Sequence, residues 1–169
     1  YNFSFSDKFL EILARQSNQE IQSFKNETYL GMARNFKRFG WIYLFLFGSS
    51  PAVCNSFVAG REHNLEVLPS GGFYKPSATS LRMGDLGYIS KAQDDLNISY
   101  NSIEEYCTEL KNALVKTYKP YEDIGEFIAG ERVQLNTSVI QIENEYYSTI
   151  RPKRVCPSGE RPINILRSQ

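Results

Sequence analysis

The stretch NSIEEYCTELKNALVKTY (101–118) decides the fold, because it is the clearest helix in the chain. Ser102 is followed three positions later by Glu105, the spacing of a capping box, in which side chains satisfy the free N–H groups of the first helical turn. Apolar residues then recur at intervals that place them on one face of a helix. These residues are Ile103, Tyr106, Leu110 and Leu114.

Two more helices are expected on the N-terminal side of this stretch. Ser6 or Asp7 is suited to cap a short helix over roughly 7–16. A polar SNQE (17–20) separates it from a long helical pattern with apolar residues three to five positions apart: Ile21, Phe24, Tyr29, Met32 and Phe36. WIYLFLF (41–47) is too short to cross a bilayer, which needs about 20 residues. We interpret it as the buried end of the same helix, stopped by Gly48 and Pro51.

Strands are expected near the two ends of the chain. YNFSF (1–5) alternates as a half-buried strand does, and VQLNTSVIQIEN (133–144) reads as one or two strands with a bulge or turn at Asn136. Segment 61–79 is loop-like, and ATSLRMGDLGY (78–88) is expected to be an extended segment followed by a turn. The predicted fold class is therefore α+β.

Composition limits the classes of function. The chain has 169 residues, about one domain, with 19 Lys+Arg against 19 Asp+Glu. This balance argues against a nucleic-acid or anionic-membrane binder, because both need a basic surplus. The 3 cysteines lie far apart without a CxxC pair, which favours a reducing, cytosolic compartment. The single histidine, His63, excludes a His/Cys zinc cluster and is expected on the surface. A chain opening on Tyr1 is expected to be an interior piece of a longer polypeptide.

Familiar catalytic motifs, among them GxGxxG, GxxxxGK[ST], HExxH and GxSxG, are missing. Arg82, in TSLRMGDLGY, is a candidate for holding a small acid, because a guanidinium donates two parallel hydrogen bonds to a carboxylate. Pairing of Arg82 with Asp85 across a turn is an equal alternative. Cys54 is expected to pack at a helix end as a small hydrophobe.

The stretch VIQIENEYYSTIRPKR (139–154) crowds charge and aromatic surface into a few positions. Three cations around Pro152 could neutralise a polyphosphate, since cations stabilise charge in phosphoryl transfer. They are Arg151, Lys153 and Arg154. Glu143 and Glu145 could be metal ligands or counter-charges. A solvated turn with a basic tail is the alternative interpretation.

Three long stretches resemble the central part of the proteobacterial-type glutamate–cysteine ligase, also called γ-glutamylcysteine synthetase. They are RNFKRFGWIYLFLFGSSPAVCNSF (34–57), ATSLRMGDLGY (78–88) and QIENEYYSTIRPKR (141–154). The similarity runs along the whole chain. It implies that 1–169 is the central segment of one catalytic domain, part of a glutamine synthetase-like fold in which antiparallel strands pack with helices. It also implies ATP-dependent joining of the glutamate γ-carboxylate to cysteine through a γ-glutamyl phosphate, the first step of glutathione biosynthesis, with Mg²⁺.

The resemblance also implies roles for individual residues. Arg82 matches an arginine that holds the cysteine carboxylate, Tyr88 and Tyr147 match tyrosines of the cysteine side-chain pocket, and Asn2 matches an asparagine near the glutamate and metal site. Four further residues are assigned to ATP phosphates or to the wall beside them: Asn144, Arg151, Lys153 and Arg154. Direct contact with the phosphates and support of the residues that make this contact are equal alternatives. No metal ligand is assigned within the chain, because most of the family's metal ligands would lie outside it. Residues 1–169 alone are therefore expected to be inactive.

Two other interpretations stay open. A sister ligase of the same fold would join glutamate to a different amine, and the expected pocket favours an amino-acid acceptor without naming it. A non-catalytic interaction module would instead use the apolar end of the long helix as a docking surface. On the leading interpretation the partners are glutamate, cysteine, ATP and the rest of the same polypeptide, in the cytoplasm.

Overall fold

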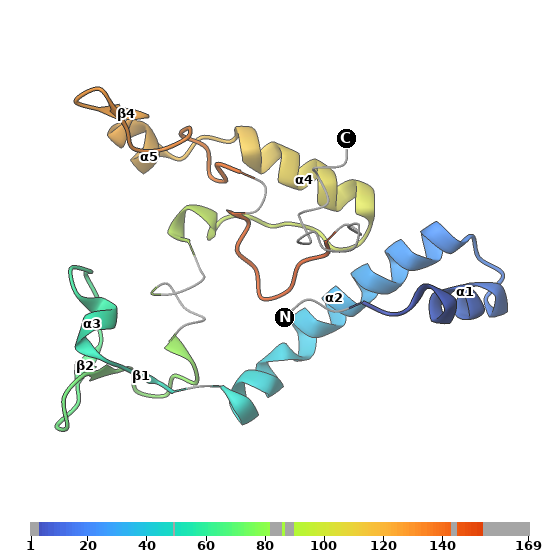
Figure 1. Ribbon diagram of the computed structural model, residues 1–169, viewed down its shortest axis with the longest axis horizontal. Helices are drawn as coiled ribbons and strands as arrows, with labels where there is room; N and C mark the ends of the chain where they lie inside the picture. The colour runs from blue at the N-terminus through green and yellow to red at the C-terminus, as the bar shows by residue number, and fades with distance from the viewer. Residues whose placement is uncertain (1–3, 49, 82–85, 87–89, 143–144, 154–169) are drawn as a thin grey trace.

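A computed structural model describes residues 4–48, 50–81, 86, 90–142 and 145–153 of the chain. Helices and small antiparallel sheets follow one another, so the predicted α+β class is confirmed (Figure 1). The helices are α1 (Asp7–Gln16), α2 (Ile21–Phe47), α3 (Asn55–Val58), α4 (Ile103–Val115) and α5 (Lys119–Ile124), with a 3₁₀ turn η2 (Lys91–Gln93). The strands are β1 (Ala52–Val53), β2 (Glu66–Val67), β3 (Phe73–Tyr74), β4 (Phe127–Ile128) and β5 (Glu131–Arg132).

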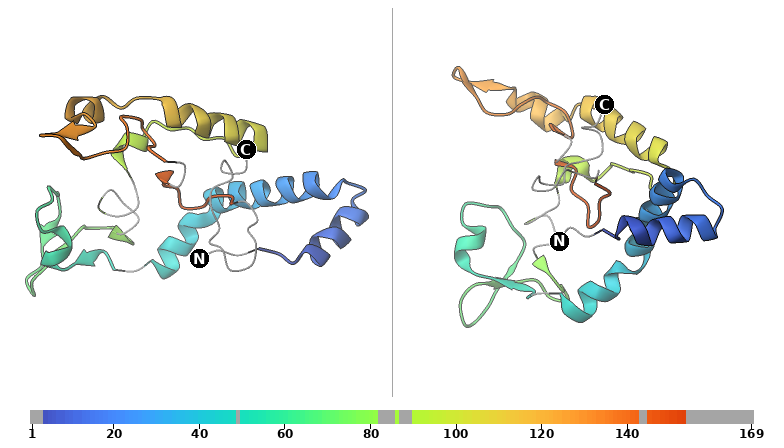
Figure 2. Two further views of the ribbon diagram at one scale, coloured as in Figure 1. Left: turned by 45° about the horizontal axis from the view of Figure 1, so that its top comes forward. Right: turned by 45° about the vertical axis from the view of Figure 1, so that its right-hand side comes forward.

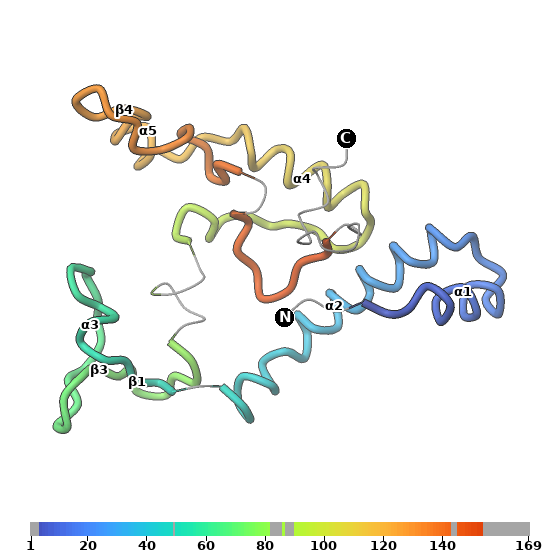
Figure 3. The backbone as a smooth tube through the Cα atoms, viewed as in Figure 1, coloured from blue at the N-terminus to red at the C-terminus, as the bar shows by residue number. Residues whose placement is uncertain are grey.

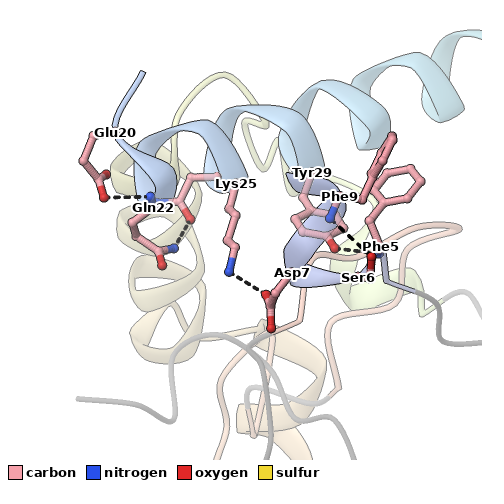
Figure 4. Close-up of polar contacts among 9 residues, drawn as sticks. Phe5, Ser6, Asp7, Phe9, Glu20, Gln22, Lys25 and Tyr29 are labelled. Carbon is pink, nitrogen blue, oxygen red and sulfur yellow. Dashed lines mark hydrogen bonds and ion pairs between the residues drawn. The ribbon is translucent and has the colours of Figure 1, made fainter. Parts of the chain in front are cut away.

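The first two helices begin at side-chain caps. Ser6 accepts a hydrogen bond from the N–H of Phe9, which confirms the predicted cap of α1. Glu20 caps α2, with its carboxylate accepting from the N–H groups of Gln22 at 2.9 Å and Ser23 at 2.7 Å (Figure 4). These bonds favour the ionised form and lower the pKa of Glu20.

Helices α1 and α2 form an antiparallel pair joined by a short polar turn. Lys25 on α2 reaches Asp7 on α1 with 2.7 Å between Nζ and Oδ1, and the Tyr29 hydroxyl accepts the N–H of Phe5 at 3.0 Å (Figure 4). The aromatic rings of Phe5 and Tyr29 stack with 6.2 Å between their centroids. Described residues 4–5 are not in a strand, so the prediction of a strand over 1–5 is wrong where it can be checked, and residues 1–3 lie outside the described residues.

The long helix α2 has the predicted extent and ends at Gly48, whose N–H donates to Leu44 O. The predicted burial of its last turns is wrong. The exposed fraction is 63% for Trp41, 71% for Phe45 and 77% for Phe47. The end of α2 leads away from α4 toward the small sheet in Figures 1 and 2, and nothing in the described part of the chain covers these side chains. No helix among the described residues is long and apolar enough to cross a membrane.

The middle of the chain, which the sequence marks as loop, contains a small antiparallel sheet in the order β1-β3-β2. Each strand has only two residues, too few to show an alternating pattern. The β2–β3 hairpin closes through Gly71 and Gly72, which have φ of 93° and 92°. At Gly72 a Cβ atom would lie 2.7 Å from Val53 O, so this position requires glycine. The expected extended segment at 78–88 lies largely outside the described residues.

Helix α4 carries the main core, as its sequence predicts. Ser102 accepts the N–H of Glu105 at 3.1 Å, and Tyr106, Leu110 and Ala113 are buried. Ile103 and Leu114 pack against the same cluster, which also takes in residues from α2 and from the C-terminal segment. The cluster comprises Leu30, Ala33, Ala92, Ile98, Tyr100, Tyr106, Leu110, Ala113, Val139, Ile140 and Tyr146.

The predicted strands over 133–144 are absent from described residues 133–142. Val139 and Ile140 are neighbours and are both buried, because the segment crosses α4 with consecutive side chains against the core instead of alternating. A single bridge joins Ser138 to Thr117. The predicted turn at Asn136 is confirmed, since its side chain accepts the N–H of Ser138 at 2.9 Å. The strands of the described residues lie between Ala52 and Arg132, so the expected strands are missing from described residues 4–5 and 133–142.

Candidate functional site

A cavity of about 560 Å³ lies where η2, the segment after β5 and the segment after Ile142 meet. In Figure 3 the red segment 145–153 runs beside the yellow-green segment that leads into α4. The volume is that of a site for a small molecule. The cavity is lined by Ser90, Gln93, Tyr121, Arg132, Val133, Gln134, Leu135, Val139, Gln141, Glu145 and Tyr147.

The side-chain amide of Gln93 fixes one side of the cavity. Its Nε2 donates to Glu145 O at 2.7 Å, and its Oε1 accepts the N–H of Tyr147 at 2.8 Å. Gln93 closes η2, and the preceding Ala92 is buried in the core. The amide therefore ties the backbone on both sides of Tyr146 to a turn that the core holds in place.

The opposite side of the cavity is built by two more amides. Gln134 Nε2 donates to Tyr121 O at 2.7 Å and to Gly125 O at 2.8 Å. Gln141 Oε1 accepts the N–H of Leu135 at 2.9 Å, and Gln141 Nε2 donates to Gln134 Oε1 at 3.3 Å. Each amide already has protein partners, so this wall is held in shape without a ligand.

The buried side chain of Tyr100 holds the segment 146–150 through its hydroxyl. The Tyr100 hydroxyl donates to Ile150 O at 2.9 Å and lies 3.2 Å from Ser148 Oγ and 3.4 Å from Tyr146 Oη. Burial raises the pKa of Tyr100 far above its usual value, so the hydroxyl stays protonated and available as a donor. Tyr106 packs beside it with 5.2 Å between ring centroids, and burial raises its pKa as well.

Helix α2 reaches this tyrosine from the other side. Arg34 Nη1 donates to Tyr100 O at 2.6 Å, and the Lys37 ammonium lies 4.6 Å from the centre of the Tyr100 ring. The cation over the ring is a further attraction between α2 and the core. The N-terminal helices are therefore connected to the wall of the cavity through Tyr100.

Of the predicted site residues, Tyr147 is brought to the cavity, with an exposed fraction of 43%. Arg151 and Lys153 are half-buried and do not line it. Arg151 Nη1 donates to Tyr146 O at 2.6 Å, so this guanidinium also braces the loop that carries Tyr147. The remaining predicted residues lie outside the described residues: Asn2, Arg82, Tyr88, Asn144 and Arg154.

Ser90, which follows the predicted motif 78–88 in the sequence, lines the same cavity as Tyr147. More than 50 positions separate Ser90 from Tyr147 in the sequence.

The structure also places three further residues for which the sequence makes predictions. Glu145 Oε2 accepts the N–H of Gln141 at 3.1 Å, so this carboxylate closes a loop. Cys54 is exposed at the start of α3, 3.1 Å from Ser56 Oγ, so the prediction that it packs at a helix end is wrong. His63 is partly exposed, in keeping with its expected place on the surface, and its ring centroid lies 4.6 Å from that of Phe73 in the small sheet.

Among the described residues no group of three or more His, Cys, Asp or Glu side chains could hold a metal ion. The cavity offers one carboxylate, Glu145, and one guanidinium, Arg132, beside neutral amides. This donor set does not fit Mg²⁺, which takes carboxylate and phosphate oxygens.

Comparison with known proteins gives a consistent result. The sequence model of the family described as glutamate–cysteine ligase matches residues 1–169. A glutamate–cysteine ligase of Janthinobacterium sp. is 47% identical over 168 residues, and one of Azotobacter vinelandii is 48% identical over 171 residues; each alignment covers 98% of this chain and 32% of the relative. The crystal structure of glutamate–cysteine ligase from Francisella tularensis in complex with AMP is similar with a TM-score of 0.74 and 39% identity, over 95% of this chain and 31% of that one. The chain thus spans about a third of the length of these relatives.

Proposed function

This chain belongs to the glutamate–cysteine ligase family, and on that premise we propose that the complete polypeptide joins glutamate to cysteine in an ATP-dependent reaction. The observation that carries the proposal is that Tyr147 lines a cavity together with Ser90, which follows the resembling segment 78–88 in the sequence. The resemblance assigns Tyr88 and Tyr147 to the cysteine pocket. The Francisella enzyme was crystallised in complex with AMP, which supports a nucleotide as a substrate of this reaction beside glutamate and cysteine.

The reaction has two balanced steps. The γ-carboxylate of glutamate takes the terminal phosphoryl group of ATP, which gives γ-glutamyl phosphate and ADP. The amine of cysteine then attacks the acyl carbon, phosphate leaves, and the amine loses a proton. A carboxylate is a poor acyl donor until its oxygen is converted to a leaving group, so phosphorylation has to precede the attack. The product is γ-glutamylcysteine, so this reaction is the first step of glutathione biosynthesis.

The roles of individual residues are part of the proposal. Arg82 holds the carboxylate of cysteine, Tyr88 and Tyr147 bound its side-chain pocket, and Asn2 lies toward glutamate. The structure supports Tyr147, which lines the cavity. Four residues are proposed at the nucleotide phosphates or behind them: Asn144, Arg151, Lys153 and Arg154. The bond from Arg151 to Tyr146 O favours an indirect role for that residue.

Mg²⁺ belongs to the proposed reaction because cations offset the repulsion between a carboxylate and a triphosphate. The described residues do not provide its ligands. A cytosolic location is proposed with the enzyme, in keeping with the free thiols of Cys54 and Cys107.

The chain is proposed to be the central segment of one catalytic domain, and the remaining polypeptide is proposed to cover the end of α2. The apolar face there includes Trp41, Phe45 and Phe47, and monomeric soluble proteins rarely leave such a patch exposed. The relatives are about three times as long as this chain, which is ample material to cover it. This explains the exposed aromatic side chains without a separate docking partner.

The test uses the complete polypeptide and follows γ-glutamylcysteine formation from ATP, glutamate and cysteine. Arg82→Lys loses the two parallel hydrogen bonds to the carboxylate, which costs roughly 1–3 kcal/mol. The KM for cysteine should rise while those for ATP and glutamate stay nearly unchanged. Arg15→Lys on the exposed surface of α1 is the matched control and should change none of them. Absence of product, or an equal rise in all three constants, refutes the proposal.

A sister ligase with another acceptor is the second candidate, because the cavity lining has amides and two tyrosines but nothing among its described residues specific for a thiol. Rates with cysteine, 2-aminobutyrate, glycine and simple amines separate the two. A preference for cysteine supports the first proposal. Equal rates with simple amines support the second, because they show that no carboxylate is recognised.

A further inference from the structure

Gln93 was not singled out by any sequence motif, yet its side chain holds the backbone at Tyr147, one of the two described tyrosines that line the cavity. Its amide bridges Glu145 O and the N–H of Tyr147, positions that are 52 and 54 residues away in the chain. The backbone of Gln93 is itself fixed, because its N–H donates to Ser90 O at 2.8 Å and its carbonyl accepts the N–H of Leu96 at 3.0 Å. The amide therefore projects from a rigid turn.

The two bonds define which atoms the side chain must present. Glu145 O can only accept, so it needs an N–H, and Tyr147 N–H can only donate, so it needs an oxygen. A carboxamide of this length provides both at once. A carboxylate of the same shape would accept from Tyr147 but would set an oxygen against Glu145 O. A thioether of similar length would provide neither bond.

We propose that Gln93 is a positioning residue for acceptor recognition: its carboxamide fixes the backbone on both sides of Tyr146 and thereby sets the place of the Tyr147 ring in the pocket for an amino-acid acceptor. The inference rests on the proposed function, which assigns Tyr147 to that pocket. Gln93 acts through Tyr147. Arg151 holds the same segment through a different atom, because its guanidinium donates to Tyr146 O.

The experiment measures the KM for cysteine, glutamate and ATP in the complete polypeptide with Gln93→Glu and Gln93→Met. Each variant loses one or both bonds, and the KM for cysteine should rise about tenfold, the scale of one to two net hydrogen bonds. The constants for ATP and glutamate should stay within about twofold. Gln22→Glu on the exposed face of α2 is the matched control for the added charge.

A second background separates positioning from general damage. In Tyr147→Ala, Gln93→Met should cause no further rise in the KM for cysteine, because the side chain that Gln93 positions is gone. Additive effects in the two backgrounds overturn the inference. So does an equal rise in all three constants, or a melting temperature lowered without a change in the KM for cysteine.

The failure of the inference can be told apart from the failure of the proposed function. If Tyr147→Ala raises the KM for cysteine while both Gln93 variants match the unmodified protein, only the role of Gln93 is overturned. If Tyr147→Ala leaves the KM for cysteine unchanged, the assignment of Tyr147 is wrong and the inference falls with it.

Discussion

Two buried tyrosines in the same core should respond in opposite ways to loss of the hydroxyl. Tyr100 and Tyr106 have exposed fractions of 4% and 0%, and their rings touch. The Tyr100 hydroxyl donates to Ile150 O and approaches Ser148 Oγ and Tyr146 Oη. Within the described part of the chain, the Tyr106 hydroxyl has no hydrogen-bond partner. Replacement of either residue by phenylalanine removes one hydroxyl oxygen from the same buried core. The two replacements differ in whether that hydroxyl is hydrogen-bonded among the described residues.

The magnitudes follow from these partners. Tyr100→Phe loses a hydrogen bond and leaves Ile150 O without its donor, which should lower the free energy of unfolding by roughly 1–2 kcal/mol. Tyr106→Phe removes a buried polar atom that has no compensating bond, so it should leave that free energy unchanged or raise it by up to about 1 kcal/mol. The difference between the two variants is therefore about 2 kcal/mol.

The assay is thermal or urea unfolding of the complete polypeptide, with each variant compared with the unmodified protein at neutral pH. Burial raises the pKa of both hydroxyls, so the free energy of unfolding does not depend on their ionisation below their usual pKa of about 10 and falls as the pH rises toward the folded values. The unmodified protein should lose stability above about pH 10 more steeply than either phenylalanine variant. Equal destabilisation by both substitutions at neutral pH would refute this reasoning, because it would show that the Tyr106 hydroxyl has a partner.

Three further predictions address the helices and the whole chain. Glu20→Gln should destabilise the protein at neutral pH, because the α2 cap depends on a carboxylate whose pKa is lowered in the fold. The destabilisation should shrink as the pH falls below about 4, where this carboxylate becomes protonated. Unfolding of the variant and of the unmodified protein at pH 7 and at pH 3.5 measures the difference. Ser102→Ala should lower the free energy of unfolding by about 1 kcal/mol through loss of the α4 cap, whereas Ser102→Asp, which can still accept the Glu105 N–H, should restore most of it. A purified 1–169 polypeptide should form no γ-glutamylcysteine from ATP, glutamate and cysteine, and detectable turnover would contradict the proposal that further parts of the chain complete the site.

The helices α1, α2 and α4 could be predicted from the sequence because their signals are local, whereas the short helices α3 and α5 were not predicted. Ser6 and Ser102 stand where a cap is needed, and the apolar residues of α4 recur with the helical period over the whole element. The strands could not be predicted in the same way. Each has two residues, and its existence depends on a partner elsewhere in the chain, as in the pairing of Ala52 with Tyr74. Val139 and Ile140 show the opposite error, in which a strand was predicted but did not form. Their segment has a strand-like sequence, yet it crosses α4 without pairing as a strand.

The sequence by itself determined the helices α1, α2 and α4 and the family to which the chain belongs, and through that family it proposed Tyr147 as a pocket residue. Only the tertiary structure decided which side chains hold that pocket in shape and which apolar residues are covered. The amide of Gln93 meets its partners more than 50 positions away, and the composition of WIYLFLF is the same whether its aromatic rings are buried or exposed. The physical reason is that caps and helical periods act within a few residues, whereas hydrogen-bond partners and burial depend on segments that only the folded chain brings together.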